Sequence, residues 1–232
     1  MWNQAMKHLK QEEYQKRNMQ QHPLQLREVF LMTNKPVFFN NHRFRKKNSN
    51  TINKHDYINL SNYADSTNIL DIGFGDGDSI INTKRVDGQR IYGVESYSIG
   101  VSKVLDFINT KKIEDILIYQ GDVVEIIDNF PDSYFDYVNI FFPDPWPKRR
   151  HHKRRFITKF FLDKLKTKLK KNNQVHIASD HINYIFDTKY ILNNYLKESI
   201  QFSKHRSNRP ITKYEKKAIS KQNIIFDLIF SL

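Results

Sequence analysis

The sequence of 232 residues contains no cysteine. This absence excludes disulfide bonds, thiolate metal sites, iron–sulfur clusters and a cysteine nucleophile. The chain also has no run of about 18 apolar residues, and its first twenty residues lack an apolar core. The sequence therefore predicts neither a membrane span nor a secretory signal, and it indicates a globular cytoplasmic protein.

Acidic residues are too few to balance the basic ones. The chain has 38 Lys and Arg against 25 Asp and Glu, which gives a formal net charge of +13. Such an excess favours a polyanionic partner. With 39% hydrophobic and 13% aromatic residues, the chain is not a disordered basic tail. The richness in Lys, Asn and Ile has a second explanation, an AT-rich genome, in which case part of the charge is compositional.

Glycine is scarce and concentrated, because all seven glycines lie between positions 73 and 121. A residue used so sparingly is expected where the backbone needs a positive φ or a close approach. Gly73, Gly75 and Gly77 directly follow an apolar segment. This order is typical of a strand that turns tightly into a helix around a ligand.

Apolar segments of strand length alternate with helical segments over most of the chain. This alternation predicts an α/β domain over residues 63–232, with a mostly parallel sheet covered by helices on both faces. Residues 1–62 predict a basic N-terminal extension, partly helical at 3–20 and otherwise irregular, with a charge run at 43–47. The expected strands are 68–72, 91–95, 115–119, 135–142, 174–179 and 224–230. The expected helices are 78–86, 97–110, 122–129, 153–171 and 183–198.

Four successive strands of this sheet end on, or are followed by, an acidic residue: Asp71, Glu95, Asp122 and Asp144. In an open α/β fold these strand ends meet at the binding edge. S-adenosyl-L-methionine suits such a series, because it carries an ammonium group and a ribose diol and has no phosphates. The pyrophosphate of NAD would be repelled by Asp71 and Asp76, and the spacing G-x-G-x-G also differs from the dinucleotide pattern G-x-G-x-x-G.

We therefore predict an S-adenosyl-L-methionine site. Glu95 is expected on the ribose hydroxyls and Asp122 on the adenine amine. A dinucleotide site, and a tight turn with no ligand, are the alternatives. The predicted cofactor-binding residues are Asp71, Gly73, Gly75, Gly77, Glu95, Asp122 and Asp144.

A stiff loop and a basic run follow the fourth strand. The segment Phe141–Lys148 carries three alternating prolines, which stiffen the loop where an active site is expected. The run Arg149–Arg155 comes directly after it and contains only Arg, Lys and His. A solvated face explains this combination poorly, so the run predicts contacts to the phosphates of RNA. Trp146 can stack on a base or pack against the protein, and both interpretations stay open.

Taken in chain order, these motifs resemble the bacterial tRNA (guanine-N7-)-methyltransferase family over about residues 68–230. The resemblance implies a class I S-adenosyl-L-methionine-dependent, Rossmann-like fold and methylation of a guanosine in the tRNA variable loop. It implies cofactor contacts at Asp71, Glu95, Asp122 and Asp144, although Asp71 stands where a glutamate is common in the family. The matching segments are Asp71–Gly77, Gly93–Glu95, Gly121-Asp122, Phe141–Lys148 with its basic run, Ala178–Asp180 and Arg209–Glu215.

The same resemblance implies a set of substrate contacts. The basic run would face the RNA, and Asp180 would lie near the reacting base. The implied substrate-binding residues are Lys148, Arg149, Arg150, His151, His152, Lys153, Arg154, Arg155, Asp180, Thr212, Lys213, Tyr214 and Glu215.

Guanine N7 has an in-plane lone pair and no proton, so its methylation needs no general base. The predicted catalytic residues, Asp144 and Asp180, would instead stabilise the purine cation that forms. Each assignment has a structural alternative. Asp180 fits a helix N-cap, and Thr212 with Glu215 fits a capping box. No metal site is expected, because His151 and His152 lack a carboxylate partner at ligand spacing.

Two other functions stay open at this point. One is methylation of another RNA, and the other is an RNA-binding module with a decayed cofactor site. The expected partner is tRNA. Membrane partners are not expected, and the sequence leaves the oligomeric state open, with a monomer slightly favoured.

Overall fold

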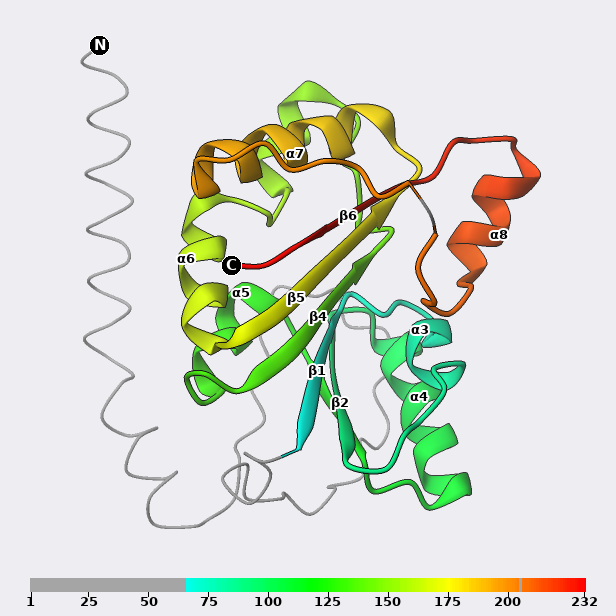
Figure 1. Ribbon diagram of the computed structural model, residues 1–232. Helices are drawn as coiled ribbons and strands as arrows, with labels where there is room; N and C mark the ends of the chain where they lie inside the picture. The colour runs from blue at the N-terminus through cyan, green and yellow to red at the C-terminus, as the bar shows by residue number, and fades with distance from the viewer. Residues whose placement is uncertain (1–65, 205) are drawn as a thin grey trace. The chain divides into compact units, whose positions relative to one another are not determined.

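The computed structural model describes residues 66–204 and 206–232 (Figure 1). The predicted extension 1–62, with its helix at 3–20 and its charge run at 43–47, lies outside these residues. In chain order the elements are β1 (Thr67–Ile72), α3 (Asp78–Ile81), β2 (Gln89–Glu95), α4 (Ser98–Lys111), β3 (Ile116–Gln120), α5 (Val123–Ile126), the 3-10 helix η2 (Ile127–Asn129), β4 (Phe135–Phe141), the 3-10 helix η3 (Arg149–Arg154), α6 (Lys159–Lys168), β5 (Leu169–Ser179), α7 (Ile182–Leu196), α8 (Lys213–Ser220) and β6 (Phe226–Phe230).

The strands form one six-stranded sheet in the order β3-β2-β1-β4-β5-β6. Strands β1 to β5 pair in parallel, and β6 pairs antiparallel with β5. After β1 the chain adds β2 and β3 on one side of it, and then adds β4, β5 and β6 on the other side. The strand order therefore reverses between the neighbouring strands β1 and β4. In open α/β sheets, ligands bind at such a switch point, beyond the carboxyl ends of the strands. The predicted α/β fold is confirmed.

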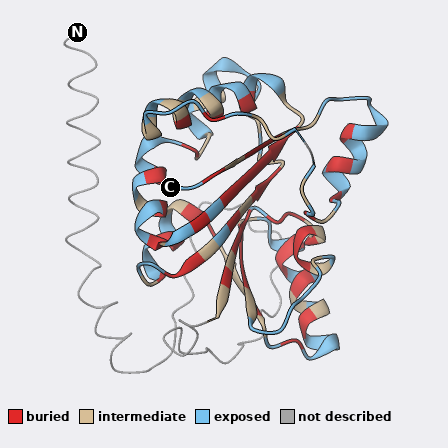
Figure 2. Cartoon of the chain, viewed as in Figure 1, coloured by how far each residue is buried: buried red, intermediate tan, exposed pale blue. Residues whose placement is uncertain are grey.

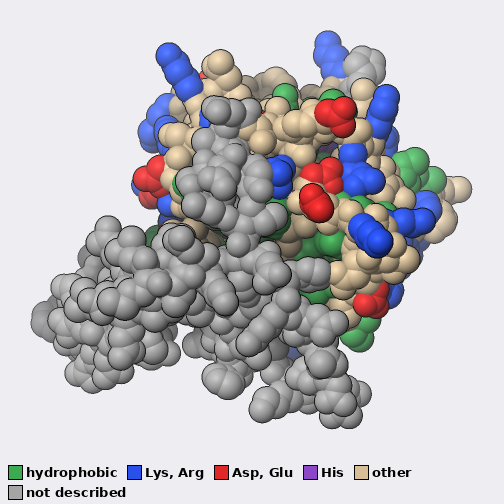
Figure 3. Space-filling view, turned by 90° about the horizontal axis from the view of Figure 1, so that it is seen from below, with side chains coloured by type: hydrophobic (Ala, Val, Ile, Leu, Met, Phe, Trp, Pro, Cys, Tyr) green, Lys and Arg blue, Asp and Glu red, His purple; other side chains and the backbone are tan. Residues whose placement is uncertain are grey.

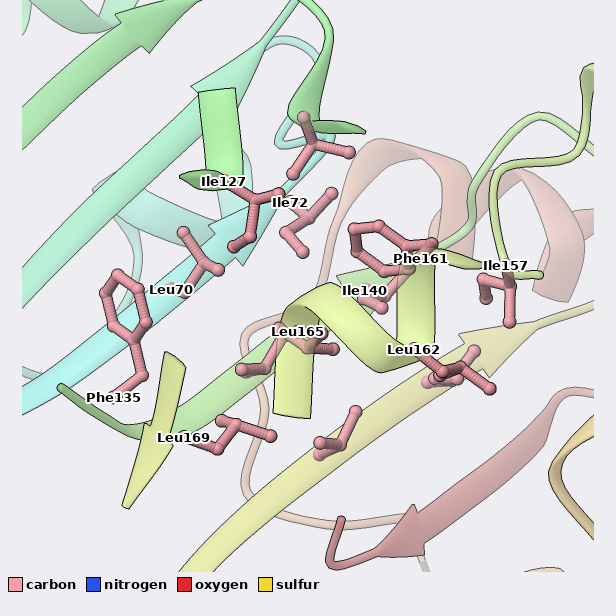
Figure 4. Packing of buried hydrophobic residues seen from close by; sticks show 14 of the residues in the cluster. Leu70, Ile72, Ile127, Phe135, Ile140, Ile157, Phe161, Leu162, Leu165 and Leu169 are labelled. Atoms are coloured by element: carbon pink, nitrogen blue, oxygen red, sulfur yellow. The ribbon is translucent and has the colours of Figure 1, made fainter. Parts of the chain in front are cut away.

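Apolar residues fill both faces of the sheet (Figure 2). Along β2, Tyr92 belongs to a large cluster with α5, α6 and α7, whereas Ile91 belongs to a smaller cluster with α3 and α4. Figure 4 shows part of the large cluster, where Phe161 and Leu165 of α6 lie over Ile140 of β4. Burial on both faces explains why the strands read as short apolar runs.

The structure corrects the prediction of one long helix at 153–171. The basic run forms the separate 3-10 helix η3, and α6 begins at Lys159 because the hydroxyl of Thr158 accepts a hydrogen bond from the Phe161 amide. At the other end the chain enters β5 at Leu169, which pairs with Phe135 of β4. Tertiary pairing therefore overrides the helical propensity of residues 169–171, the last part of the predicted helix.

Two other predicted helices are shorter than expected. Residues 78–86 form only the single turn α3, and residues 122–129 divide into α5 and η2. Within the described residues, no helix is long and apolar enough to cross a membrane.

Candidate functional site

The glycine loop leaves β1 and turns into α3. Gly75 has a φ of +57°, and a Cβ built on Gly100 of α4 would lie 1.8 Å from the Gly75 carbonyl oxygen. The N-terminal turn of α4 therefore touches the loop backbone, and glycine at both positions makes this approach possible. The loop is held further by the Gly73 amide, which donates to the Val94 carbonyl at 2.8 Å.

Asp71 is a buried carboxylate at the end of β1. Its side chain is 3% exposed, and Oδ1 accepts from the Ser79 hydroxyl at 3.1 Å. Desolvation by burial raises the pKa of Asp71 to about 7, and the negative charge of Glu95 adds to the shift against the hydrogen bonds of Ser79 and Asn139. These hydrogen-bond partners are neutral, so the charge of Asp71 is uncompensated by them. A bound cation would offset that cost.

Glu95 at the end of β2 fixes the loop from the other side. Its Oε2 accepts from the Gly75 amide at 2.7 Å, and its Oε1 accepts from the amides of Ser96 at 2.6 Å and Tyr97 at 2.8 Å. A carboxylate offers about four lone-pair sites, so Oε2 keeps capacity for a ligand hydroxyl. Glu95 thus orders the backbone that would surround a cofactor.

Asp122 and Asp144 complete the acidic series at the same edge. Asp122 is exposed and is the N-cap of α5, where Oδ1 accepts from the Val124 amide at 2.9 Å. Asp144 is exposed, and desolvation together with the charge of Glu95 raises its pKa. The carboxylates fit S-adenosyl-L-methionine on their chemistry, because the buried Asp71, whose hydrogen-bond partners are neutral, suits the ammonium, and Glu95 at the end of β2 suits the ribose diol.

The proline loop after β4 is held by an arginine of the basic run. The Arg155 Nε donates to the Pro145 carbonyl at 2.9 Å, and its Nη1 lies 2.6 Å from Asp187 of α7. Its guanidinium also covers the Tyr184 ring, and its side chain is 9% exposed. Arg155 therefore supports the loop from within, although the sequence groups it with the phosphate-binding candidates.

The other basic residues lie outward. Residues 149, 150, 153 and 154 are exposed, as is Lys148, while His151 and His152 are half-buried. Trp146 lies beneath this turn, with the Arg154 guanidinium 4.7 Å from its ring centroid and the His151 ring edge-on to it. Trp146 thus packs against η3 and does not belong to either core cluster.

Positive charge is not confined to that region. On the face seen in Figure 3, side chains of Lys and Arg stand beside those of Asp and Glu. The net charge alone therefore does not locate an RNA-binding surface. The cations of η3 are the better candidates for RNA contacts, because η3 lies beside the proline loop at the carboxyl edge of the sheet.

Asp180 directly follows β5 and is not a helix cap. His181 is the N-cap of α7, where its Nδ1 accepts from the Tyr184 amide at 3.3 Å. The Asp180 carboxylate accepts from the side-chain amide of Asn223, which follows α8, at 2.8 Å. The N-cap alternative for Asp180 is therefore wrong, and its carboxylate stays half-exposed at the carboxyl edge.

The segment Thr212–Glu215 forms the start of α8, which Figure 1 shows beyond α3. Thr212 is the N-cap and accepts from the Glu215 amide at 3.2 Å. The Lys213 amide donates to Asp78 at 2.6 Å, its ammonium binds Asp76, and the Tyr214 ring would lie 3.2 Å from a Cβ on Gly75. The structure thus brings this distant segment onto the glycine loop.

Glu215 turns away from the loop, unlike its three predecessors. Its carboxylate is 1% exposed and is bound by Arg206 and Arg209. The Thr212 cap is therefore half of a capping box, since the Glu215 side chain does not return to Thr212. Sequence reasoning missed the roles of these arginines, because their partners are not at a local spacing that predicts contact.

The described residues contain no group of three or more His, Asp or Glu side chains that could hold a metal ion. His151 and His152 lie in η3 without a neighbouring carboxylate ligand set.

Known proteins are similar to this chain in sequence and in fold. Residues 65–228 match a family described as "Putative methyltransferase". A tRNA (guanine-N(7)-)-methyltransferase of Buchnera aphidicola subsp. Acyrthosiphon pisum (strain Tuc7) is 39% identical over 174 residues, covering 71% of this chain and 72% of the relative. A protein of the same name from Nitrosococcus oceani is 36% identical over 165 residues, covering 70% of each chain.

Solved structures agree on the fold. An antibiotic-related methyltransferase superposes with a TM-score of 0.55 at 13% identity, covering 78% of this chain and 97% of that one. The aminoglycoside resistance methyltransferase NpmB1 gives a TM-score of 0.52 at 14% identity, covering 74% and 91%. At such identities these likenesses show the Rossmann-like methyltransferase fold alone. The sequence relatives are more similar to this chain, at 36–39% identity over about 70% of its length. Their identity and coverage show that the chain belongs to the tRNA (guanine-N(7)-)-methyltransferase family.

Proposed function

We propose that this protein transfers a methyl group from S-adenosyl-L-methionine to N7 of a guanosine in the variable loop of tRNA. One observation carries the proposal: a buried carboxylate that favours a cation, Asp71, and a turn of exposed cations, η3, lie at the carboxyl ends of neighbouring strands β1 and β4. The first suits the cofactor and the second suits an RNA backbone. The names of the relatives supply the nucleic acid and the atom.

The residues at the carboxyl edge divide between cofactor and substrate. We assign Asp71, Glu95 and Asp122 to the cofactor, which supplies an electrophilic methyl group when bound. The glycine loop, with Gly73, Gly75 and Gly77, would bring its backbone against it. For the RNA we assign the outward cations Lys148, Arg149, Arg150, Lys153 and Arg154 with His151 and His152.

No residue of this site has to act as a base. Guanine N7 attacks with its lone pair, the bond from methyl carbon to sulfur breaks, and the positive charge passes to the purine. The protein has to align the two reactants and exclude water. We propose that Asp144 and Asp180, which follow the adjacent strands β4 and β5, stabilise the purine cation.

The substrate segment of α8 is the third part of the site. Lys213 and Tyr214 contact the glycine loop and are exposed to the RNA, Thr212 caps the helix from a buried position, and Glu215 would act through its arginine partners. We also propose a cytoplasmic location, which a reaction on tRNA supports.

The test is transfer of tritiated methyl groups to total bacterial tRNA, followed by nuclease digestion and identification of the labelled nucleoside. We expect 7-methylguanosine. A tRNA transcript whose variable-loop guanosine is changed to adenosine is the matched control, and it should accept no label. Another methylated nucleoside, or equal labelling of both transcripts, would contradict the assignment. Failure of S-adenosyl-L-homocysteine to bind in calorimetry would instead support a decayed cofactor site.

A further inference from the structure

Helix α8 has almost no apolar surface with which to hold its place. Of its eight residues, only Glu215 and Ala218 are buried, and Ile219 is 57% exposed. Burying one alanine contributes little compared with the side chain of a leucine or phenylalanine. Apart from the Tyr214 ring against Gly75, the position of α8 therefore depends on polar contacts.

A buried ionic cluster occupies the face of the sheet beside α8. On β4, β5 and β6, Phe141, His176 and Asp227 share the face that α3 and α4 cover farther along the sheet. His176 Nε2 lies 2.6 Å from Asp227 Oδ1, and its Nδ1 lies 3.2 Å from the Ser207 hydroxyl. Asp227 is 6% exposed, so it needs compensation by a cation.

Arg209 provides this compensation and joins three parts of the chain. Its Nε donates to Asp227 of β6 at 2.8 Å, and its Nη1 donates to Glu215 of α8 at 2.5 Å. Its guanidinium lies over the rings of Phe141 and Phe142, at 5.6 and 5.5 Å from their centroids. With 2% of its side chain exposed, Arg209 is an internal brace and not a surface cation.

This brace determines where the substrate segment lies. Phe142 leads directly into the loop with Asp144, and Glu215 is three residues from the Thr212 cap. Fixing Phe142 and Glu215 to one guanidinium therefore fixes the start of α8 relative to the proline loop. At its other end, α8 is followed by Asn223, which donates to Asp180 at 2.8 Å.

We propose that Arg209 is a positioning residue for methyl transfer, which holds the α8 segment Thr212–Tyr214 against the exit of β4. It does so through Glu215, Asp227 and the two phenylalanine rings. This inference rests on the proposed function. It assigns to Glu215 a role in orienting α8 in place of a direct contact with guanine.

Two variants test the brace. Arg209→Lys keeps one positive charge, but an ammonium does not bridge two carboxylates in a plane or stack on two rings as a guanidinium does. Glu215→Gln keeps the shape and the Thr212 cap and removes the charge that Arg209 and Arg206 bind. The control is Lys170→Met, which breaks the partly buried Lys170–Asp136 pair at 2.8 Å, far along β5 from α8.

The first measurement is hydrogen–deuterium exchange of the free protein. In both brace variants the amides of α8 should exchange faster, while those of β1, β4 and β5 stay protected. The Lys170→Met control should leave α8 unchanged. A residue that only touched guanine would not alter α8 in the free protein, and a merely destabilising change would accelerate exchange throughout the sheet. Either of these patterns would overturn the proposal.

The second measurement is methyl transfer under single-turnover and steady-state conditions. A misplaced substrate segment should lower kcat/KM for tRNA by about 10²-fold, with a much smaller change in affinity for S-adenosyl-L-homocysteine. Unchanged kcat/KM in Arg209→Lys and Glu215→Gln, or an equal loss in Lys170→Met, would contradict positioning. If the parent enzyme gave no 7-methylguanosine, the proposed function would fail, and the exchange experiment would still decide the brace.

Discussion

Asp71 should make cofactor binding depend on pH. The free protein holds this carboxyl with a pKa of about 7, because burial penalises its charged form. The cofactor ammonium binds the ionised form, so protonation of Asp71 competes with binding. The apparent dissociation constant then scales inversely with the ionised fraction of Asp71, and between pH 7.0 and pH 5.5 it should rise by about 15-fold for a pKa near 7. Over this range the α-ammonium, with an ordinary pKa of about 7.7–8.0, stays charged.

The assay is calorimetric titration with S-adenosyl-L-homocysteine, which keeps the ammonium and cannot transfer a methyl group. Asp71→Asn is the matched variant. It should bind with the same affinity at both pH values, and at pH 7 it should lose about 1.5–3 kcal/mol, the scale of a hydrogen bond to a charged group. An equal pH dependence in the parent and in Asp71→Asn would refute the assignment of Asp71 to the ammonium.

The Asp71→Asn variant should weaken cofactor binding but increase the stability of the free protein. The pKa of Asp71 is raised from 3.8 to about 7, so the folded state binds more protons than the unfolded state between these values. Stability of the free protein is therefore lost as the pH rises from about 4 to about 7. Each unit of pKa shift corresponds to about 1.36 kcal/mol. Removing the charge should therefore stabilise the free protein at pH 8 by at most about 4 kcal/mol, for the shift from 3.8 to about 7. Urea titration at pH 8 measures the difference, and a destabilised Asp71→Asn would contradict the reasoning.

Three further predictions concern the loop, the basic run and the core. Gly75→Ala should impair methyl transfer, because a Cβ there lies 3.2 Å from the Tyr214 ring at a φ of +57°; normal kinetics would show that the contact is dispensable. Arg150→Gln with Lys153→Gln should lower the salt dependence of tRNA binding by about 0.7–0.9 in log–log slope for each lost phosphate contact; binding measured against salt, with an unchanged slope, would remove them from the interface. Leu165→Ala, at a fully buried position of α6, should cost about 2–5 kcal/mol in urea unfolding, and a loss below 1 kcal/mol would mean that this core relaxes.

Much of the fold could be predicted because its signals are local. The central parallel strands are buried on both faces over most of their length, so they read as apolar runs, and the tight turn after β1 requires glycine. The error at 153–171 has a different origin. Its lysine-rich end has a helical pattern, yet Leu169 pairs with Phe135 of β4, and a contact over such a separation leaves no periodic signal.

The candidate site was predictable to the extent that strand ends define it. Asp71, Glu95, Asp122 and Asp144 fall at the carboxyl edge because parallel strands end together, and this follows from the order of elements. Which side chain faces a ligand does not follow in the same way. Asp122 also caps α5, and the two oxygens of Glu95 already hold backbone amides.

By itself the sequence determined the class of fold, the acidic strand ends, the stiff loop and the adjoining cations, since each is written in consecutive residues. The tertiary structure alone decided that Arg155 turns inward to Pro145 and Asp187, and that Arg209 joins Glu215 to Asp227. It also decided the raised pKa of Asp71. The reason is physical: burial and the pairing of charges depend on which distant segments meet, and an arginine in a basic run has the same local signature whether it faces solvent or a buried carboxylate.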